Sequence, residues 1–263
     1  MTKIAKRRTT MKLGAQFYSI RNLTQTPEDI RNSFKKIKEI GYDVAQMSGI
    51  GPIDPHMLKD ISDEFSLPIT CTHSSYDRIV SDTAALIQEH KIYGCPVIGL
   101  GGMPPKYRGS VDGVQAFIKE IAEPMKKIKA EGMEFAYHNH AFEFDRLSDG
   151  SRIFDILSED CEELSFILDI YWLHYAGEDH LKYISVYGGS RMSNVHFKDM
   201  KSEPQGAICP CGTGTIDMKA AYDACVAAGV KYAQVEQDNA PDSGDAIGEM
   251  KTSYVNLAPI FGK

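Results

Sequence analysis

The sequence predicts a single-domain (β/α)₈ barrel. A length of 263 residues fits one such domain, because α/β barrels run to about 250 residues as one unit. Short apolar runs alternate with amphipathic stretches roughly every 30 residues, which is typical of βα units that build a parallel sheet. No composition break and no linker rich in proline or serine divides the chain. We therefore expect residues 12–263 to form one barrel that follows a flexible arm at residues 1–11.

Eight apolar runs are the candidate strands, and polar turn residues follow each of them. These runs lie at residues 13–20, 44–49, 68–74, 96–102, 134–140, 164–170, 193–199 and 232–238. Eight strands of this kind favour a closed barrel over an open, doubly wound sheet.

Helices are expected between these strands. Thr26 can cap the first helix, Pro27 suits its first turn, and Gly41 ends it. The other expected helices lie at residues 54–65, 79–93, 111–131, 151–158, 217–228 and 245–257, with a shorter one at 179–187.

The composition narrows the classes of function. Hydrophobic residues make up 43% and charged residues 25%, which is ordinary for a globular protein. A formal net charge of −7 argues against nucleic-acid binding, which requires Lys and Arg to neutralise phosphates. No apolar run is long enough for a membrane span, and the basic start lacks the apolar segment of a secretory signal. With this charge balance, a neutral or cationic small substrate is easier to accommodate, and a homo-oligomer is compatible with the sequence.

The six cysteines do not form a dense disulfide pattern. They are spread along the chain, at positions 71, 95, 161, 209, 211 and 225. Free thiols in a reducing cytoplasm fit this spacing best. We therefore expect a cytoplasmic protein whose cysteines are structural or incidental.

Polar residues gather where the predicted strands end. In a barrel, the carboxyl ends of the strands meet at the mouth of the active site. The residues concerned are His73, the stretch Tyr137 to His140 with Glu143, Asp169, the stretch His196 to Asp199, and Glu236. Carboxylates and histidines should thus converge on one mouth.

Four of these residues are candidate metal ligands. Glu143, Asp169, His196 and Glu236 offer carboxylate oxygens and one imidazole, a set that suits Mn²⁺, Mg²⁺, Co²⁺ or Zn²⁺. A bound ion of this kind polarises a carbonyl group and helps to remove a neighbouring C–H proton, with a carboxylate as the base. Each of the three carboxylates has an alternative interpretation as a helix N-cap, and His196 has one as a core histidine, but these do not explain four such residues on four strand ends.

The remaining candidates surround these ligands. His138 and His140 are two residues apart on a strand, so they point to the same side and can contact substrate or support Glu143. Lys198 shares a face with His196 and can neutralise a developing oxyanion or form an ion pair. The remaining candidate substrate contacts are His73, Asp199 and Trp172, the only tryptophan. The glycine-rich segment 211–217 is expected to be a loop that leads into a helix capped by Asp217.

Several motifs resemble the sugar phosphate isomerase/epimerase-like TIM barrels, a superfamily that includes xylose isomerase, tagatose-3-epimerase-like enzymes, inosose dehydratase and endonuclease IV. The motifs are YHNHAFEF (137–144), LDIYWLHYAG (168–177), RMSNVHFKDM (191–200) with the following GTGTID, and VEQD (235–238). Weaker agreement extends through QMSGIG (46–51) and THSS (72–75), so the resemblance covers nearly the whole chain after residue 12.

The resemblance implies metal ligation by Asp169, His196 and Glu236. Epimerase-like members place a glutamate on strand five where this chain has Tyr137-His138, and the nearest glutamate here is Glu143. Either Glu143 folds back to the metal or His138 replaces it, and we expect Glu143. The implied catalytic residues are Glu236, Glu143, His138 and Lys198.

The expected function is a metal-dependent sugar or sugar phosphate isomerase or epimerase that acts through an enediolate. A displaced strand-five glutamate weakens a scheme with two symmetric glutamate bases, so a lyase or dehydratase on keto-inositols or 3-keto-glycosides, or a hydrolase-like enzyme on them, is an alternative. An endonuclease-IV-like phosphodiesterase needs more metal ligands and a basic face, which the acidic charge disfavours. The last alternative is a barrel that binds carbohydrate without catalysis.

Overall fold

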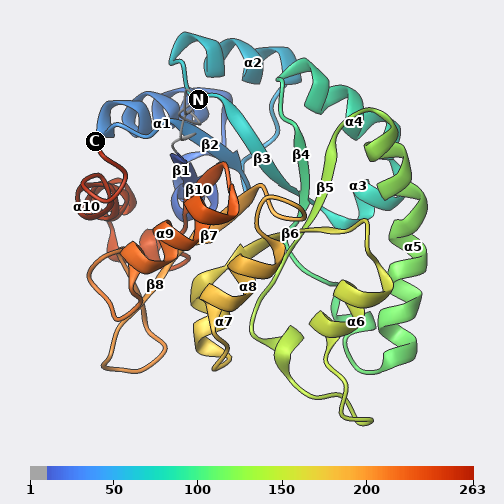
Figure 1. The fold of residues 1–263 in the computed structure, drawn as a ribbon. Coiled ribbons are helices and arrows are strands. Elements are labelled where there is room, and N and C mark those ends of the chain that lie inside the picture. The colour runs from blue at the N-terminus through green and yellow to red at the C-terminus, as the bar shows by residue number, and fades with distance from the viewer. Residues whose placement is uncertain (1–10) are drawn as a thin grey trace, which may run out of the picture.

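A closed barrel of eight parallel strands forms the centre of the protein (Figure 1). The structure is a computed structural model that describes residues 11–263. The barrel order is β1-β10-β7-β6-β5-β4-β3-β2, which confirms the predicted (β/α)₈ fold. The strands are β1 (Lys12–Gln16), β2 (Val44–Met47), β3 (Ile69–Ser74), β4 (Val97–Leu100), β5 (Glu134–His138), β6 (Ser165–Asp169), β7 (Asn194–Phe197) and β10 (Tyr232–Val235). Each overlaps one predicted strand.

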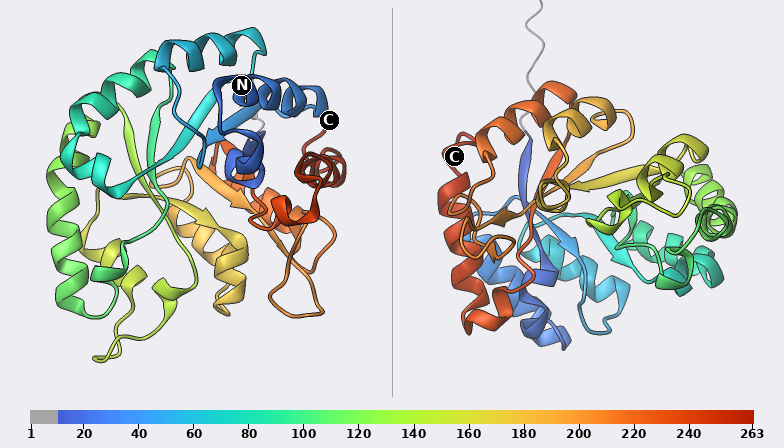
Figure 2. Two further views of the ribbon diagram at one scale, coloured as in Figure 1. Left: turned by 180° about the vertical axis from the view of Figure 1, so that it is seen from behind. Right: turned by 90° about the horizontal axis from the view of Figure 1, so that it is seen from below.

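The helices lie outside the strands, as the two further views in Figure 2 show. They are α1 (Pro27–Ile40), α2 (Pro55–Glu64), α3 (Tyr76–Ser81), α4 (Thr83–Ile92), α5 (Val111–Ala130), α6 (Ile153–Asp160), α7 (Ile170–Tyr175), α8 (His180–Tyr187), α9 (Met218–Ala228) and α10 (Ala246–Leu257). The predicted start of the first helix is confirmed, because the Thr26 hydroxyl accepts from Asp29 N at 3.2 Å and Pro27 occupies the first turn.

The structure differs from the sequence prediction in three elements. The first strand is shorter than expected because the Gln16 side chain accepts from Tyr18 N at 3.0 Å and starts the 3₁₀ helix η1 (Phe17–Leu23). The helix expected at 79–93 is two helices, α3 and α4, because Asp82 has non-helical dihedrals. Helix α7 was not predicted; it follows β6 without a loop.

A small hairpin after β7 also escaped prediction. Strands β8 (Asp199–Met200) and β9 (Ile208–Cys209) pair antiparallel outside the barrel. Two-residue strands carry too few residues to give a detectable alternation of apolar and polar side chains.

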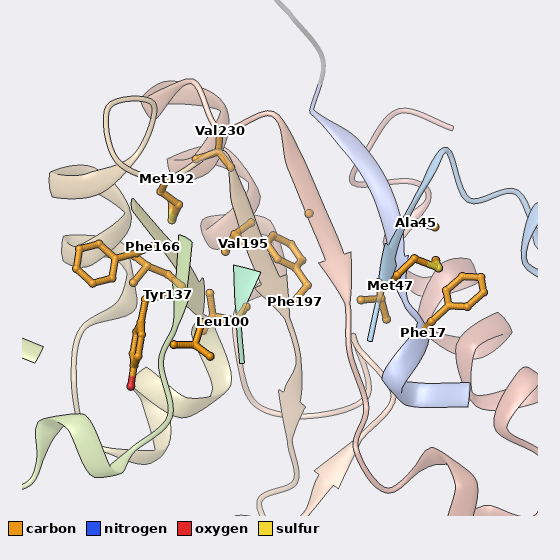
Figure 3. Close-up of a cluster of buried hydrophobic side chains, with 14 of the residues drawn as sticks. Phe17, Ala45, Met47, Leu100, Tyr137, Phe166, Met192, Val195, Phe197 and Val230 are labelled. Atoms are coloured by element: carbon orange, nitrogen blue, oxygen red, sulfur yellow. The ribbon is translucent and has the colours of Figure 1, made fainter. Parts of the chain in front are cut away.

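Side chains on each barrel strand alternate between the interior and the helix layer. On β7, Val195 and Phe197 face outward and join the hydrophobic core between strands and helices, where Figure 3 shows them. Asn194 and His196 are buried on the opposite side, inside the barrel. The same alternation determines which strand-end residues reach the mouth.

Polar groups fill part of the barrel interior. Gln234 on β10 donates to Thr70 Oγ1 at 2.9 Å and to Asn194 Oδ1 at 3.3 Å. Gly14 on β1 makes room for this side chain, since a Cβ at that position would lie 2.0 Å from Gln234 Oε1. These hydrogen bonds fix the interior below the strand ends.

Three sequence expectations concern features outside the barrel itself. The predicted arm at residues 1–11 lies outside the described residues except for Met11, which is buried. All six cysteines are buried free thiols, as expected. Within residues 11–263, none of the helices has the length and hydropathy that crossing a membrane requires.

Candidate metal centre

Four buried side chains converge at the mouth of the barrel. His138, Asp169, His196 and Glu236 each offer one ligand atom, and these atoms all lie within 4.8 Å of one another. His138 and Asp169 end β5 and β6, His196 is the penultimate residue of β7, and Glu236 directly follows β10. The parallel register places Asp169 directly beside His196, and the Glu236 backbone N–H donates to Phe197 O at 3.0 Å.

The spacing of the four ligand atoms suits one metal ion. Asp169 Oδ2 lies 3.4 Å from His138 Nε2 and 3.8 Å from His196 Nδ1. Glu236 Oε2 lies 3.0 Å from His196 Nδ1 and 4.0 Å from His138 Nε2. Metal–ligand bonds of about 2.1 Å hold adjacent and opposite ligand atoms about 3 to 4.2 Å apart. The four side chains therefore fit a divalent cation.

The two histidines present the correct ring nitrogen to the cluster. His138 Nδ1 lies 3.4 Å from the carbonyl oxygen of Gly101, and His196 Nε2 lies 2.8 Å from the side-chain oxygen of Gln46. These oxygens only accept hydrogen bonds, so the outer nitrogen of each ring carries the proton. Once the inner nitrogens are deprotonated, as metal binding requires, each would direct a lone pair to the cluster, which is how metal-binding histidines are usually oriented.

Asp169 has two roles at once. Its Oδ1 accepts from Tyr171 N at 2.8 Å and from Trp172 N at 3.2 Å, which caps helix α7. Its Oδ2 faces the two imidazoles. The capping and ligand interpretations of this carboxylate are therefore compatible, because each uses a different oxygen.

The electrostatics of the cluster attract positive charge. Burial alone would raise the pKa of Asp169, but Lys198 and the two imidazoles outweigh it and hold that pKa well below its ordinary value. Burial alone would lower the pKa of His196, yet Glu236 and Asp169 raise it to about 9. Two ionised carboxylates thus favour a cation between them and the imidazoles.

Lys198 lies beside this cluster, as its position two residues after His196 predicted. Its ammonium is buried and lies 3.9 Å from Asp169 Oδ2 and 3.7 Å from Glu236 Oε2. Its shortest contact is with Asp238 Oδ2, at 2.5 Å. Sequence reasoning missed Asp238, although its position two residues after Glu236 on the same strand face was a usable signal. The sequence allows Lys198 to pair with Asp199 or Glu236; the structure shows the contact with Glu236, and none with Asp199 among the described residues.

Glu143 lies outside the cluster, contrary to the sequence expectation. Its Oε1 accepts from the Tyr137 hydroxyl at 2.6 Å, and its Oε2 accepts from His140 N at 2.8 Å. Burial raises the pKa of this carboxyl to about 7. The reason for the difference is local: the chain turns into the 3₁₀ helix η3 (Phe142–Phe144), and Glu143 closes that turn onto the backbone. The structure brings His138 to the other three ligands instead.

Substitutions can separate these two strand-five residues. His138→Ala is expected to weaken metal binding by more than about 100-fold, because even the hydrogen-bond partners of metal ligands are worth about 10- to 100-fold. Glu143→Gln should retain metal affinity within a few-fold, since the amide can still bond Tyr137 and His140. Calorimetric titration of the two variants with Mn²⁺ checks this. If Glu143→Gln weakened metal binding more than His138→Ala did, Glu143 rather than His138 would be the metal ligand.

The cluster opens into a cavity of about 620 Å³ at the barrel mouth. His138, Lys198, Glu236 and Asp238 line its inner end. The cavity also brings together three of the four residues expected to contact substrate, namely His73, His140 and Trp172.

The fourth expected substrate residue, Asp199, lies elsewhere. It is fully buried and does not line the cavity. Its Oδ2 accepts from Gly212 N and Gly214 N at 2.9 Å each, and its Oδ1 accepts from Ile216 N at 3.1 Å. Asp199 follows Phe197 on the outward face of the strand, which is why it anchors the glycine-rich loop rather than the substrate.

Comparisons with known proteins agree with this architecture. A sugar phosphate isomerase/epimerase from Parabacteroides distasonis superposes with a TM-score of 0.78 at 18% identity, covering 98% of each chain. A D-psicose 3-epimerase from Clostridium cellulolyticum, bound to D-tagatose, has a TM-score of 0.71 at 14% identity, covering 95% of this chain and 99% of that one. A probable 3-DHS dehydratase from Bacillus anthracis gives 0.69 at 15% identity, covering 92% and 98%. No curated protein matches the chain.

The sequence also matches a family profile over most of the barrel. The profile is described as the xylose isomerase-like TIM barrel, and it matches residues 34–251. This range includes all four residues of the cluster and seven of the eight barrel strands. The chain belongs to the xylose isomerase-like TIM barrel family.

Proposed function

We propose that the protein is a divalent-metal-dependent enzyme that moves a proton on a carbohydrate, as a sugar isomerase or epimerase does. One observation carries the proposal: the four-residue cluster opens directly into the cavity of about 620 Å³ at the barrel mouth. The epimerases among the similar structures support the same class of reaction.

The cavity wall suits a ligand with many hydroxyl groups. His73 Nε2, His140 Nδ1 and Trp172 Nε1 are buried and have no hydrogen-bond partner among the described residues. All three side chains line the cavity. Buried polar atoms without partners are costly, and a polyol that fills the cavity would supply the missing hydrogen bonds.

The residues at the inner end match proton transfer next to a carbonyl group. When bound, the metal ion supplies a Lewis acid that polarises a substrate carbonyl and acidifies the neighbouring C–H bond. The Glu236 side chain reaches both the cluster and the cavity, so it is the carboxylate positioned to take that proton. The Lys198 ammonium lines the same end and stabilises negative charge that develops on a substrate oxygen.

A lyase or dehydratase on keto-inositols or 3-keto-glycosides is the second candidate. The observation that favours it is the position of His138 in the cluster, which leaves one glutamate there instead of two. A single base with a separate acid serves an elimination, whereas two bases on opposite faces serve an epimerisation. A probable dehydratase is also among the similar structures.

Proton NMR in deuterated buffer with Mg²⁺ tests the proposal on a panel of ketoses, inososes and keto-glycosides. The expected result is loss of one C–H signal from a substrate, which stops when the metal is removed by chelation. Mass spectrometry then separates the candidates, because an isomerase or epimerase conserves substrate mass and a dehydratase does not. Binding of sugars without any exchange would contradict the proposal and favour a carbohydrate-binding barrel.

A further inference from the structure

The cavity has one cation that makes no direct ion pair with a carboxylate of the described residues. Within residues 11–263, Lys198 and Arg108 are the only Lys or Arg side chains that line it. Lys198 contacts three carboxylates. Among the described residues, Arg108 forms no ion pair within 4.0 Å, and its charge acts on the buried Glu143 only from a greater distance, where it lowers the pKa of that carboxyl. Arg108 lies in the segment between β4 and α5, so its charge belongs to a different wall of the cavity from Lys198.

Arg108 is held in place by two contacts. Its Nε donates to the carbonyl oxygen of Met103 at 2.6 Å. Its guanidinium carbon lies 3.9 Å from the centroid of the Phe142 ring, which is close stacking of a cation on an aromatic face. Neither contact uses the two terminal nitrogens, which therefore keep their donors for a ligand.

The residues around Arg108 connect it to Glu143. The Tyr137 hydroxyl accepts from Met103 N at 2.9 Å and donates to Glu143 Oε1. Met103 thus bonds Tyr137 through its N–H and Arg108 through its carbonyl. This chain explains a buried Glu143 that binds no metal: it anchors the segment that carries Arg108, while Phe142 beside it supports the guanidinium.

We propose that Arg108 forms an anion subsite, so that the substrate carries a carboxylate or phosphate group on the part that lies away from the metal cluster. A guanidinium with two free terminal nitrogens matches the paired oxygens of either group. The inference rests on the proposed function, since it names the chemistry of the substrate that fills the same cavity. A neutral sugar cannot form an ion pair with this guanidinium.

Three probes of one sugar framework test the subsite by calorimetric binding to the metal-loaded protein: D-glucose, D-glucuronate and D-glucose 6-phosphate. The expected result is binding of at least one charged probe about 10- to 100-fold more tightly than glucose, as charge-assisted paired hydrogen bonds provide. The better of the two charged probes identifies the group as carboxylate or phosphate. Equal affinities, or no measurable binding of any probe, would overturn the inference.

Variants assign the preference to Arg108. Arg108→Gln is expected to remove it, and Arg108→Lys should retain only part of it because the ammonium cannot form the paired contact. Lys106→Gln is the matched control, since it makes the same charge change two residues away on an exposed side chain that does not line the cavity. A preference that survives in Arg108→Gln would refute the assignment. If the protein prefers the charged probes but catalyses no C–H exchange, only the proposed function is contradicted. If it catalyses C–H exchange but shows no preference for the charged probes, only the anion subsite is contradicted.

Discussion

Asp169→Asn is expected to abolish metal binding and C–H exchange while leaving the fold intact. The asparagine oxygen can still cap helix α7 through Tyr171 N and Trp172 N. In place of the oxygen that faces His138 and His196, the variant presents an amide N–H₂, which cannot bind a cation. Metal affinity should fall by more than about 100-fold, which exceeds the effect of removing a partner of a ligand. Elemental analysis after dialysis and the deuterium exchange assay measure both losses.

Asp179→Asn is the matched control for this change. Asp179 caps helix α8 through Leu181 N and Lys182 N in the same geometry but lies outside the cluster. The control should retain full metal content, and both variants should keep the circular dichroism spectrum of the original protein. Full metal occupancy in Asp169→Asn would remove Asp169 from the ligand set.

Lys198→Met is expected to destabilise the metal-free protein by about 3 to 5 kcal/mol, because it leaves buried carboxylates without their cation. The Lys198 side chain is only 1% exposed and its ammonium lies within 4.0 Å of Asp169, Glu236 and Asp238. Loss of this positive charge should also tighten metal binding, since like charges repel. Added metal should therefore recover part of the lost stability, whereas activity should stay low. Urea unfolding with and without Mn²⁺ measures these effects.

Lys201→Met provides the comparison for the second variant. Lys201 lies three residues further along the same segment and is exposed, so its substitution should change the free energy of unfolding by less than about 0.5 kcal/mol. Equal stability of metal-free Lys198→Met and Lys201→Met would mean that the ammonium does not balance the buried carboxylates.

The residues of the site that lie on barrel strands could be predicted from the sequence, because side chains on a strand alternate strictly between its two faces. Asp169, His196 and Glu236 lie where apolar runs end, and alternation places each of them on the inner face. The same rule identifies Lys198, and it would have identified Asp238. Once the strands are assigned, parallel pairing brings these ends to one level without further information.

The positions of the other site residues depend on the turns that follow the strands. Such turns have no repeating pattern of side-chain directions. Glu143 and His138 both lie near the end of β5, and only the 3₁₀ turn at Phe142 decides which of them reaches the cluster. Arg108 lies in a loop after β4, where no repeating pattern indicates the direction of a side chain. The sequence suggested that Asp199 contacts substrate. In the structure its carboxylate accepts hydrogen bonds from backbone N–H groups of residues 212–216. These residues are more than ten positions away along the chain, so the sequence pattern did not indicate the contact.

The shared use of Asp169 divides the cavity into two kinds of wall. Trp172 lies on helix α7, and the first turn of this helix is capped by Asp169, which is itself part of the cluster. A change in that wall would therefore disturb the cluster. Arg108 stands on a loop that is anchored through Tyr137 and Glu143, neither of which belongs to the cluster. Under the proposed function, substitutions in that loop are expected to alter substrate preference while the cluster is preserved. The two walls belong to separate segments of the chain, so one of them can change without the other.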